Sequence, residues 1–145
     1  MGEWGYRVSG VRGWEEGAEV SKLLKNRSFD QHPSTLLSLL FPPTSPPYLP
    51  YEVVERIKEV VRWGERQRRY SIQSSSLLIA IDREEMVSPK VKMIDFAHTF
   101  PSCPCSSPHT CNIWSSQWIE GCQLLCEDIL EIGEANKIMN QNSHF

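Results

Sequence analysis

The clearest hydrophobic pattern in the chain lies in residues 51–69. Its aliphatic side chains recur at the three- and four-residue spacing of one helix face: Val53, Val54, Ile57, Val60 and Val61. That spacing predicts an amphipathic helix with one buried stripe. The apolar run from Thr35 to Phe41 predicts a shorter helix, which ends at the prolines of residues 42–50 because proline lacks a backbone donor. We therefore expect an extended loop between these two helices.

Two strand-like runs follow the long helix. Residues 74–82 and residues 90–96 are rich in aliphatic side chains, and a polar stretch of hairpin-loop size separates them. This pattern predicts a two-stranded antiparallel ribbon. A further short strand is expected over residues 5–12, whereas residues 18–29 favour a short helix or irregular structure.

The C-terminal part of the chain changes from a loop-like to a helical pattern. Residues 101–115 are rich in cysteine, serine and proline, which predicts an inserted loop. Residues 116–131 predict a final helix, and the tail from Asn140 to Phe145 is expected to fray. The apolar face of that helix carries Ile119, Cys122, Leu125, Cys126 and Ile129. Together the elements predict an α+β fold in one domain over residues 1–145.

Composition narrows the class of protein. The chain has 145 residues, 40% of them hydrophobic and 23% charged, as in a globular domain. Its net charge of −3 argues against a generally basic nucleic-acid-binding protein. No apolar run approaches the ~18 residues of a membrane span, and the first residues lack the apolar core of a signal peptide. Five cysteines without an export signal favour reduced thiols in the cytoplasm or nucleus.

The ribbon carries polar groups at its open end. Pairing the loop-side ends of the two strands and counting outward places Ser75 and Ser76 opposite Asp95 and Phe96. Hydroxyl and carboxylate oxygens are the ligands that Mg²⁺ prefers beside nucleotide phosphates. From the residues alone, Asp95 is better explained as an edge residue that faces water.

Two strings within this ribbon resemble the inositol polyphosphate kinase family. They read Ser-Ser-Leu-Leu at residues 75–78 and Met-Ile-Asp-Phe-Ala-His-Thr at residues 93–99. They are most similar to the multikinase and hexakisphosphate-kinase branches, which carry Ala-His after the Asp-Phe. Weaker similarities extend over most of the chain, such as Gly-Tyr-Arg-Val-Ser-Gly at residues 5–10. The resemblance implies the fold of the C-lobe of such a kinase, an antiparallel ribbon or small sheet packed with helices.

Carried over residue by residue, the resemblance implies a site for Mg-ATP and a substrate. It implies that Asp95 binds the magnesium and that Ser76 lies at the metal and phosphates, with Ser75 as a further candidate. It also implies that His98 contacts the inositol phosphate. The implied activity is ATP- and Mg²⁺-dependent phosphoryl transfer to an inositol phosphate, with no nucleic-acid or membrane partner and no identified protein partner.

The family signature Pro-x-x-x-Asp-x-Lys-x-Gly does not occur in the sequence. Because that motif supplies groups central to phosphoryl transfer, the resemblance assigns no catalytic residue to this chain. We expect a C-lobe-like fragment with little activity alone, since phosphoryl transfer depends mostly on positioning and charge neutralisation. The alternative is a catalytically inactive truncated remnant that acts as a binding or regulatory piece.

Two further clusters allow more than one explanation. Four arginines gather at the end of the long predicted helix: Arg62, Arg66, Arg68 and Arg69. They either stabilise the helix end through its dipole or bind an anion. Four soft metal ligands occur within the loop: Cys103, Cys105, His109 and Cys111. They either bind zinc or are free groups of an inserted loop.

A protein kinase is a weaker alternative. Asp95-Phe96 resembles the start of the Asp-Phe-Gly motif, but Ala97 stands in the place of the glycine. The sequence also lacks a His-Arg-Asp catalytic loop and a glycine-rich phosphate loop.

Overall fold

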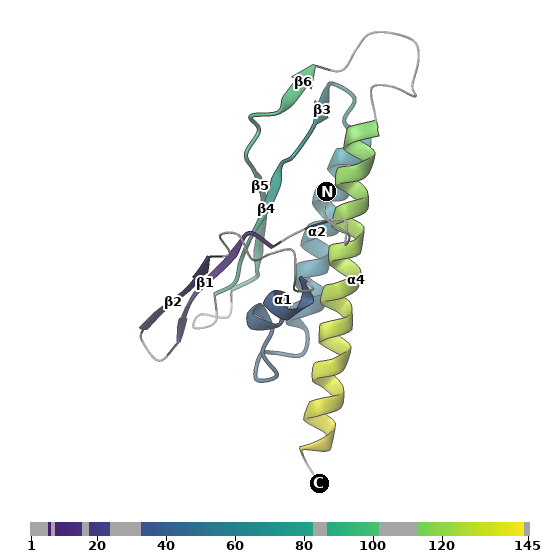
Figure 1. Cartoon of the computed structure of the whole chain (residues 1–145). Coiled ribbons are helices and arrows are strands. Elements are labelled where there is room, and N and C mark those ends of the chain that lie inside the picture. The colour runs from purple at the N-terminus through teal and green to yellow at the C-terminus, as the bar shows by residue number, and fades with distance from the viewer. Residues whose placement is uncertain are drawn as a thin grey trace.

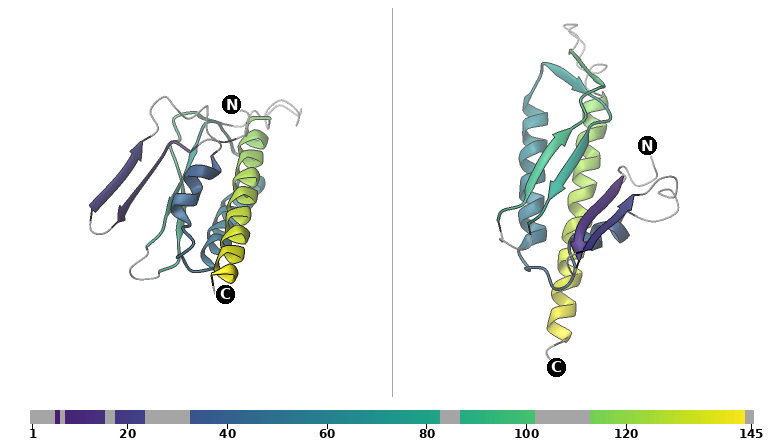
Figure 2. Two further views of the ribbon diagram at one scale, coloured as in Figure 1. Left: turned by 60° about the horizontal axis from the view of Figure 1, so that its bottom comes forward. Right: turned by 90° about the vertical axis from the view of Figure 1, so that its left-hand side faces the viewer.

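The computed structural model describes residues 6, 8–15, 18–23, 33–82, 87–101 and 113–143. Within these residues the fold is α+β, with three helices and three two-stranded antiparallel sheets, which confirms the predicted class. Helices α2 (Leu49–Arg66) and α4 (Ile113–Asn142) lie side by side in one layer. A β-ribbon lies across both helices and forms the second layer (Figures 1 and 2).

The two helices predicted before the ribbon are both present. α1 (Ser34–Leu40) buries Leu36 and Leu37, and α2 buries the predicted aliphatic stripe except for Val60, which is half-buried. α2 begins at Leu49, with Pro50 in its first turn, where a helix does not require the missing backbone donor. The loop before it is not extended as expected, because it contains hydrogen-bonded turns. In one of them the backbone N–H of Ser45 donates to the carbonyl oxygen of Pro42 at 2.9 Å.

Helix α4 is much longer than the sequence pattern predicted. It has 30 residues and continues through Asn142, so the prediction of a frayed tail is wrong for residues 140–142. Two amide side chains anchor this extension: Asn136 donates to the carbonyl oxygen of Phe41 at 2.8 Å, and Asn140 donates to that of Pro43 at 3.2 Å. The extension is therefore held by the loop that precedes α2. Despite this length, no helix in the described ranges is apolar enough to cross a membrane.

The N-terminal part forms a hairpin that projects from the body of the molecule (Figure 1). Strand β1 (Gly10–Glu15) pairs antiparallel with β2 (Ala18–Leu23). The predicted strand over residues 5–12 therefore lies further along the chain. The expectation of a helix or irregular structure is wrong for residues 18–23, because pairing with β1 makes them a strand. Residues 24–29 of the same prediction lie outside the described part.

The predicted ribbon is confirmed as β4 (Ser76–Ala80) paired with β5 (Lys90–Ile94). The sequence analysis missed two short strands, β3 (Tyr70–Ile72) and β6 (Thr99–Pro101). They pair with each other next to the end of the ribbon that is formed by Ser76 and Ile94. β6 and α4 occupy the two ends of the predicted loop at 101–115, and the rest of that loop lies outside the described residues.

The main hydrophobic core lies between α2, α4 and the inner face of the ribbon. Ile57 of α2 and Ile129 of α4 are both 0% exposed. Cys122 and Cys126 are buried beside them, so these free thiols act as small packing groups. Burial raises the pKa of Cys122 to about 12, and the neighbouring Cys126 acts in the same direction. Both features favour a neutral, unreactive thiol at this position.

Candidate functional site at the ribbon bulge

The ribbon is interrupted at one point by unequal numbers of residues on its two strands. Ile72 pairs with Thr99 on the outer side of the interruption, and Ser76 pairs with Ile94 on the inner side. Three residues, 73–75, therefore lie between the two pairs on one strand, and four residues, 95–98, lie between them on the other. The extra residue forms a β-bulge, which bends a ribbon and changes the direction of the side chains beside it.

Asp95 adopts an unusual backbone conformation in this bulge. Its φ is 65°, and Ser74 on the facing strand has a φ of 54°. Aspartate enters this left-handed region more readily than most residues because its short side chain can bond to the local backbone. Here the N–H of Ala97 donates a long hydrogen bond, 3.4 Å, to Oδ1 of Asp95. β5 therefore ends at Ile94, and the carboxylate lies on an exposed turn.

Two hydrogen bonds join the two sides of the bulge, and a third connects the bulge to α4. The Ser75 hydroxyl donates to the carbonyl oxygen of Asp95 at 2.9 Å, and the backbone N–H of Gln73 donates to that of His98 at 3.0 Å. From α4, the indole N–H of Trp118 donates to the carbonyl oxygen of Ser75 at 3.0 Å. The backbone that carries Asp95 is thus connected through Ser75 to the helical layer.

All four candidate site residues lie in or beside the bulge. Ser75 is half-buried, whereas Ser76, Asp95 and His98 are exposed. The predicted register is wrong for Ser76, because that residue pairs with Ile94. β4 ends at Ala80, two residues before the end of the run predicted over residues 74–82. The loop that connects β4 to β5 is therefore longer than the pattern indicated. Ser75 is the serine that contacts Asp95, and it does so at the backbone.

The outward face of the ribbon carries a cation that the sequence analysis did not select. Ser76 and Leu78 of β4 are exposed, as is Lys92, which pairs with Leu78. Ser76 and Lys92 therefore share one face. If side chains alternated between the two faces as far as Asp95, Lys92 and Asp95 would lie on opposite faces. The alternation ends with β5 at Ile94, however, and does not extend into the bulge. Alternate residues of β5 are exposed, and this pattern in the sequence could have placed Lys92 on the outward face.

The donor atoms at the bulge suit a hard divalent cation that arrives with its own ligands. Asp95 offers an exposed carboxylate, and Ser76 offers an exposed hydroxyl on the adjoining strand. Mg²⁺ commonly takes one or two protein carboxylates and completes its coordination with phosphate oxygens and water. In the part of the chain that the structure describes, no three His, Cys, Asp or Glu side chains gather as a metal site. One exposed carboxylate and one exposed hydroxyl are the kinds of oxygen donor that a nucleotide-bound magnesium ion takes from a protein.

The four residues of the zinc hypothesis lie outside the described residues: Cys103, Cys105, His109 and Cys111.

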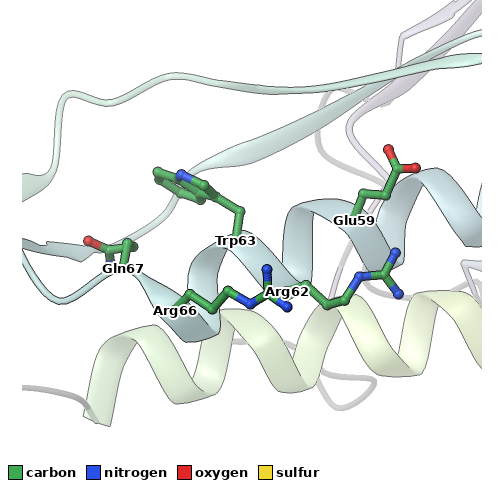
Figure 3. Close-up of a pocket in the computed structure, with 5 residues that line it drawn as sticks. All are labelled: Glu59, Arg62, Trp63, Arg66 and Gln67. Atoms are coloured by element: carbon green, nitrogen blue, oxygen red, sulfur yellow. The ribbon is translucent and has the colours of Figure 1, made fainter.

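A second feature lies on the exposed flank of α2, where a shallow depression has a volume of about 440 Å³. It is lined by Glu59, Arg62, Trp63, Arg66 and Gln67 (Figure 3). The structure thus divides the arginine cluster of the sequence into two pairs. Arg62 and Arg66 line the depression, whereas Arg68 and Arg69 lie exposed beyond the end of α2.

Comparison with known proteins adds one match. The chain matches the family model of inositol polyphosphate kinase over residues 1–129. A comparison with curated proteins gives no match. The matched range includes the whole ribbon, its bulge and the first part of α4. Because the match covers 129 of the 145 residues, the chain belongs to the inositol polyphosphate kinase family.

Proposed function

We propose that the chain binds Mg-ATP at the ribbon bulge and acts in phosphoryl transfer from ATP to an inositol phosphate. The family match supports this class of reaction. The observation that carries the proposal is the conformation of Asp95, whose carboxylate is exposed on a left-handed residue that Ser75 and Ala97 hold in place. A carboxylate held on an anchored backbone is suited to a site that must position a metal.

Each residue of the bulge has a distinct role in this proposal. Asp95 holds the magnesium ion, and Ser76 donates a hydrogen bond to a nucleotide phosphate. Ser75 keeps the backbone of Asp95 in position through its own hydroxyl. His98 contacts the inositol phosphate from the exposed turn that follows. When bound, magnesium would neutralise charge on the phosphates that the reaction rearranges.

The backbone conformation at residue 95 does not require a charged side chain. Asparagine or glycine would satisfy the left-handed backbone at least as well. Lys92, on the same face as Ser76, supplies the positive charge that a phosphate group favours. An exposed carboxylate near a cationic face therefore supports metal-assisted phosphate binding at the bulge.

The alternative is a binding or regulatory piece that holds the nucleotide without transferring a phosphoryl group. The favouring observation is that the sequence lacks the family signature Pro-x-x-x-Asp-x-Lys-x-Gly, which supplies groups central to phosphoryl transfer. One carboxylate can anchor a nucleotide-bound ion, but transfer also requires the acceptor hydroxyl in line with the phosphate. Measuring binding and turnover on the same sample separates the two possibilities.

The test compares the full chain with the Asp95→Asn variant. Asparagine keeps the left-handed backbone and the bond from Ala97, so we expect an unchanged thermal midpoint. We expect calorimetry to show that magnesium-dependent ATP binding is lost. Glu127→Gln, which removes an exposed carboxylate from α4, is the matched control and should bind normally.

Transfer of labelled phosphate from ATP to a panel of inositol phosphates then reports turnover. Labelled product with the wild type and none with Asp95→Asn supports the proposed kinase. Magnesium-dependent binding without product supports the binding piece. Equal ATP affinity in the wild type and Asp95→Asn would contradict the role of Asp95 in both.

A further inference from the structure

We propose that the depression on α2 is a second ligand site, which binds a small, multiply phosphorylated anion between Arg62 and Arg66. None of the residues that line it belongs to the ribbon bulge. The proposal therefore concerns a different part of the molecule from the Mg-ATP site, and it does not depend on that site.

The two arginines bring positive charge that other side chains of the helix do not neutralise. In the described part of the chain, the salt bridges of α2 join Arg56 to Glu59 at 2.9 Å and Lys58 to Glu55 at 3.5 Å. Neither salt bridge involves Arg62 or Arg66. Glu59 is the acidic residue in the lining, and its carboxylate is already paired with Arg56. The depression is therefore cationic although the whole chain has a net charge of −3.

The arrangement of these groups suits phosphate esters. Arg62 and Arg66 are four residues apart, so they lie on one flank of α2, about one helical turn from each other (Figure 3). A guanidinium group is a planar set of donors that can bond two oxygens of one phosphate. Two such groups at this spacing can hold neighbouring phosphates of one ligand.

The remaining walls of the depression are a flat apolar surface and a rigid amide. Trp63 is 48% exposed, and its ring borders the depression on the ribbon side of α2 (Figure 3). Gln67 is held by two bonds to the backbone of Tyr70, at 2.6 Å and 3.0 Å. The amide wall is therefore in place before a ligand arrives, which lowers the entropic cost of binding there.

The size of the depression indicates a small molecule. Its volume of about 440 Å³ is within the range of small-molecule sites, ~300–1,000 Å³. A stable protein interface requires ~800 Å² on each partner, which is much more than five side chains provide. Because the depression is shallow, a hydrated polyanion fits it better than an apolar ligand.

The experiment uses inorganic tripolyphosphate as the probe, with EDTA present and at low ionic strength. Removing divalent ions eliminates the metal-dependent binding proposed for Asp95, and the probe has no inositol ring for His98. Calorimetry on the full chain should show binding of one equivalent. Binding should weaken as salt is added, because both arginines are exposed.

Two double variants locate the site. Arg62→Gln with Arg66→Gln should raise the Kd at least about tenfold, because it removes two charge-assisted contacts. Arg68→Gln with Arg69→Gln removes the same charge outside the depression, and it should change the Kd less than about twofold. Thermal midpoints of both variants confirm the fold. Equal losses in the two variants, or no binding by the wild type, would overturn the proposal.

Two further arms identify the source of the phosphate groups and separate the sites. Asp95→Asn should bind tripolyphosphate as the wild type does, so this site can be present even if the Mg-ATP proposal fails. Vesicles of phosphatidylcholine with and without phosphatidylinositol bisphosphate test a lipid headgroup. We expect no binding to either. Binding to the phosphoinositide vesicles without binding to tripolyphosphate would overturn the assignment to a small soluble anion.

Discussion

The hydroxyl of Ser75 donates a hydrogen bond of 2.9 Å to the backbone carbonyl of Asp95, across the bulge of the ribbon. The carbonyl of the same serine accepts a bond from the indole of Trp118 on α4. Ser75 therefore joins the left-handed turn that carries the exposed carboxylate to the helical layer. Its hydroxyl bonds to the backbone of Asp95, whereas Ser76 is an exposed residue of β4.

Replacing the two serines in turn should distinguish these roles. Ser75→Ala removes the bond to Asp95, so we expect the free energy of unfolding to fall by about 1 kcal/mol. Ser76→Ala removes an exposed hydroxyl and should leave stability within about 0.5 kcal/mol of the wild type. We expect both variants to weaken Mg-ATP binding, Ser75→Ala through the backbone of Asp95. Urea unfolding and calorimetry check the pair, and equal destabilisation by both substitutions would argue against a positioning role for Ser75.

Two glycines in helices should respond to alanine with opposite signs. A Cβ at Gly133 of α4 would lie 3.1 Å from the Cβ of Pro50, whose ring cannot easily move away. A Cβ at Gly64 of α2 would meet Trp118 and Ile119 at 3.9–4.0 Å, which is ordinary contact. Alanine in a helix interior gains about 1 kcal/mol over glycine.

We therefore expect Gly64→Ala to raise the free energy of unfolding by about 1 kcal/mol. Gly133→Ala should lower it by about 1 kcal/mol, because crowding against Pro50 exceeds the gain in helix propensity. Urea unfolding measures both variants. An increase in stability for Gly133→Ala would show that α2 and α4 do not approach closely at this point.

Stability should decrease as the pH rises above about 9. Burial raises the pKa of Cys122 from its ordinary value of 9.0 to about 12. Between these values the unfolded thiol loses its proton while the folded one keeps it, so higher pH favours the unfolded chain. The contribution is complete below pH 9.0 and is lost progressively toward pH 12. Burial and the bond to Asp128 raise the pKa of Tyr6 as well, which adds a loss above pH 10.0.

The measurement is the thermal midpoint between about pH 7 and pH 10.5, for the wild type and for Cys122→Ala. The variant should start from a lower midpoint because it loses packing atoms, but its midpoint should fall less steeply above pH 9. The slope rather than the absolute value is the readout. Identical slopes in the two proteins would mean that Cys122 does not contribute to the alkaline loss.

The helices were predictable where their buried contacts produce a repeating apolar pattern in the sequence. The buried stripe of α2 is apolar at helical spacing, and its bounds differ from the prediction by two or three residues. In α4 that signal weakens after Ile132, because the residues from Gly133 to Asn142 are mostly polar and their few apolar side chains do not continue the buried stripe. The helix continues because Asn136 and Asn140 bond to carbonyl oxygens of another loop. Such contacts leave no periodic signal in the sequence.

In the candidate site, too, the sequence predicted the segments but not their alignment. The two strings at 75–78 and 93–99 identified the segments, and all four candidate residues lie where these segments meet. The bulge was not predictable, because it is a difference of one residue between two strands, and that difference exists only once both registers are known. The three-residue strands β3 and β6 are too short to show an alternating pattern of apolar and polar residues. Their pairing register therefore could not be predicted from the sequence.

By itself the sequence determined the α+β class, the amphipathic α2, the β4–β5 ribbon and the kinds of polar groups carried at its end. Periodicity specifies which face of an element is buried, and that information is local. Tertiary structure decided which serine contacts Asp95 and that Arg62 and Arg66, rather than Arg68 and Arg69, line a depression. These outcomes depend on how one element is aligned with another, and that alignment follows from packing and hydrogen bonding between segments far apart in the chain.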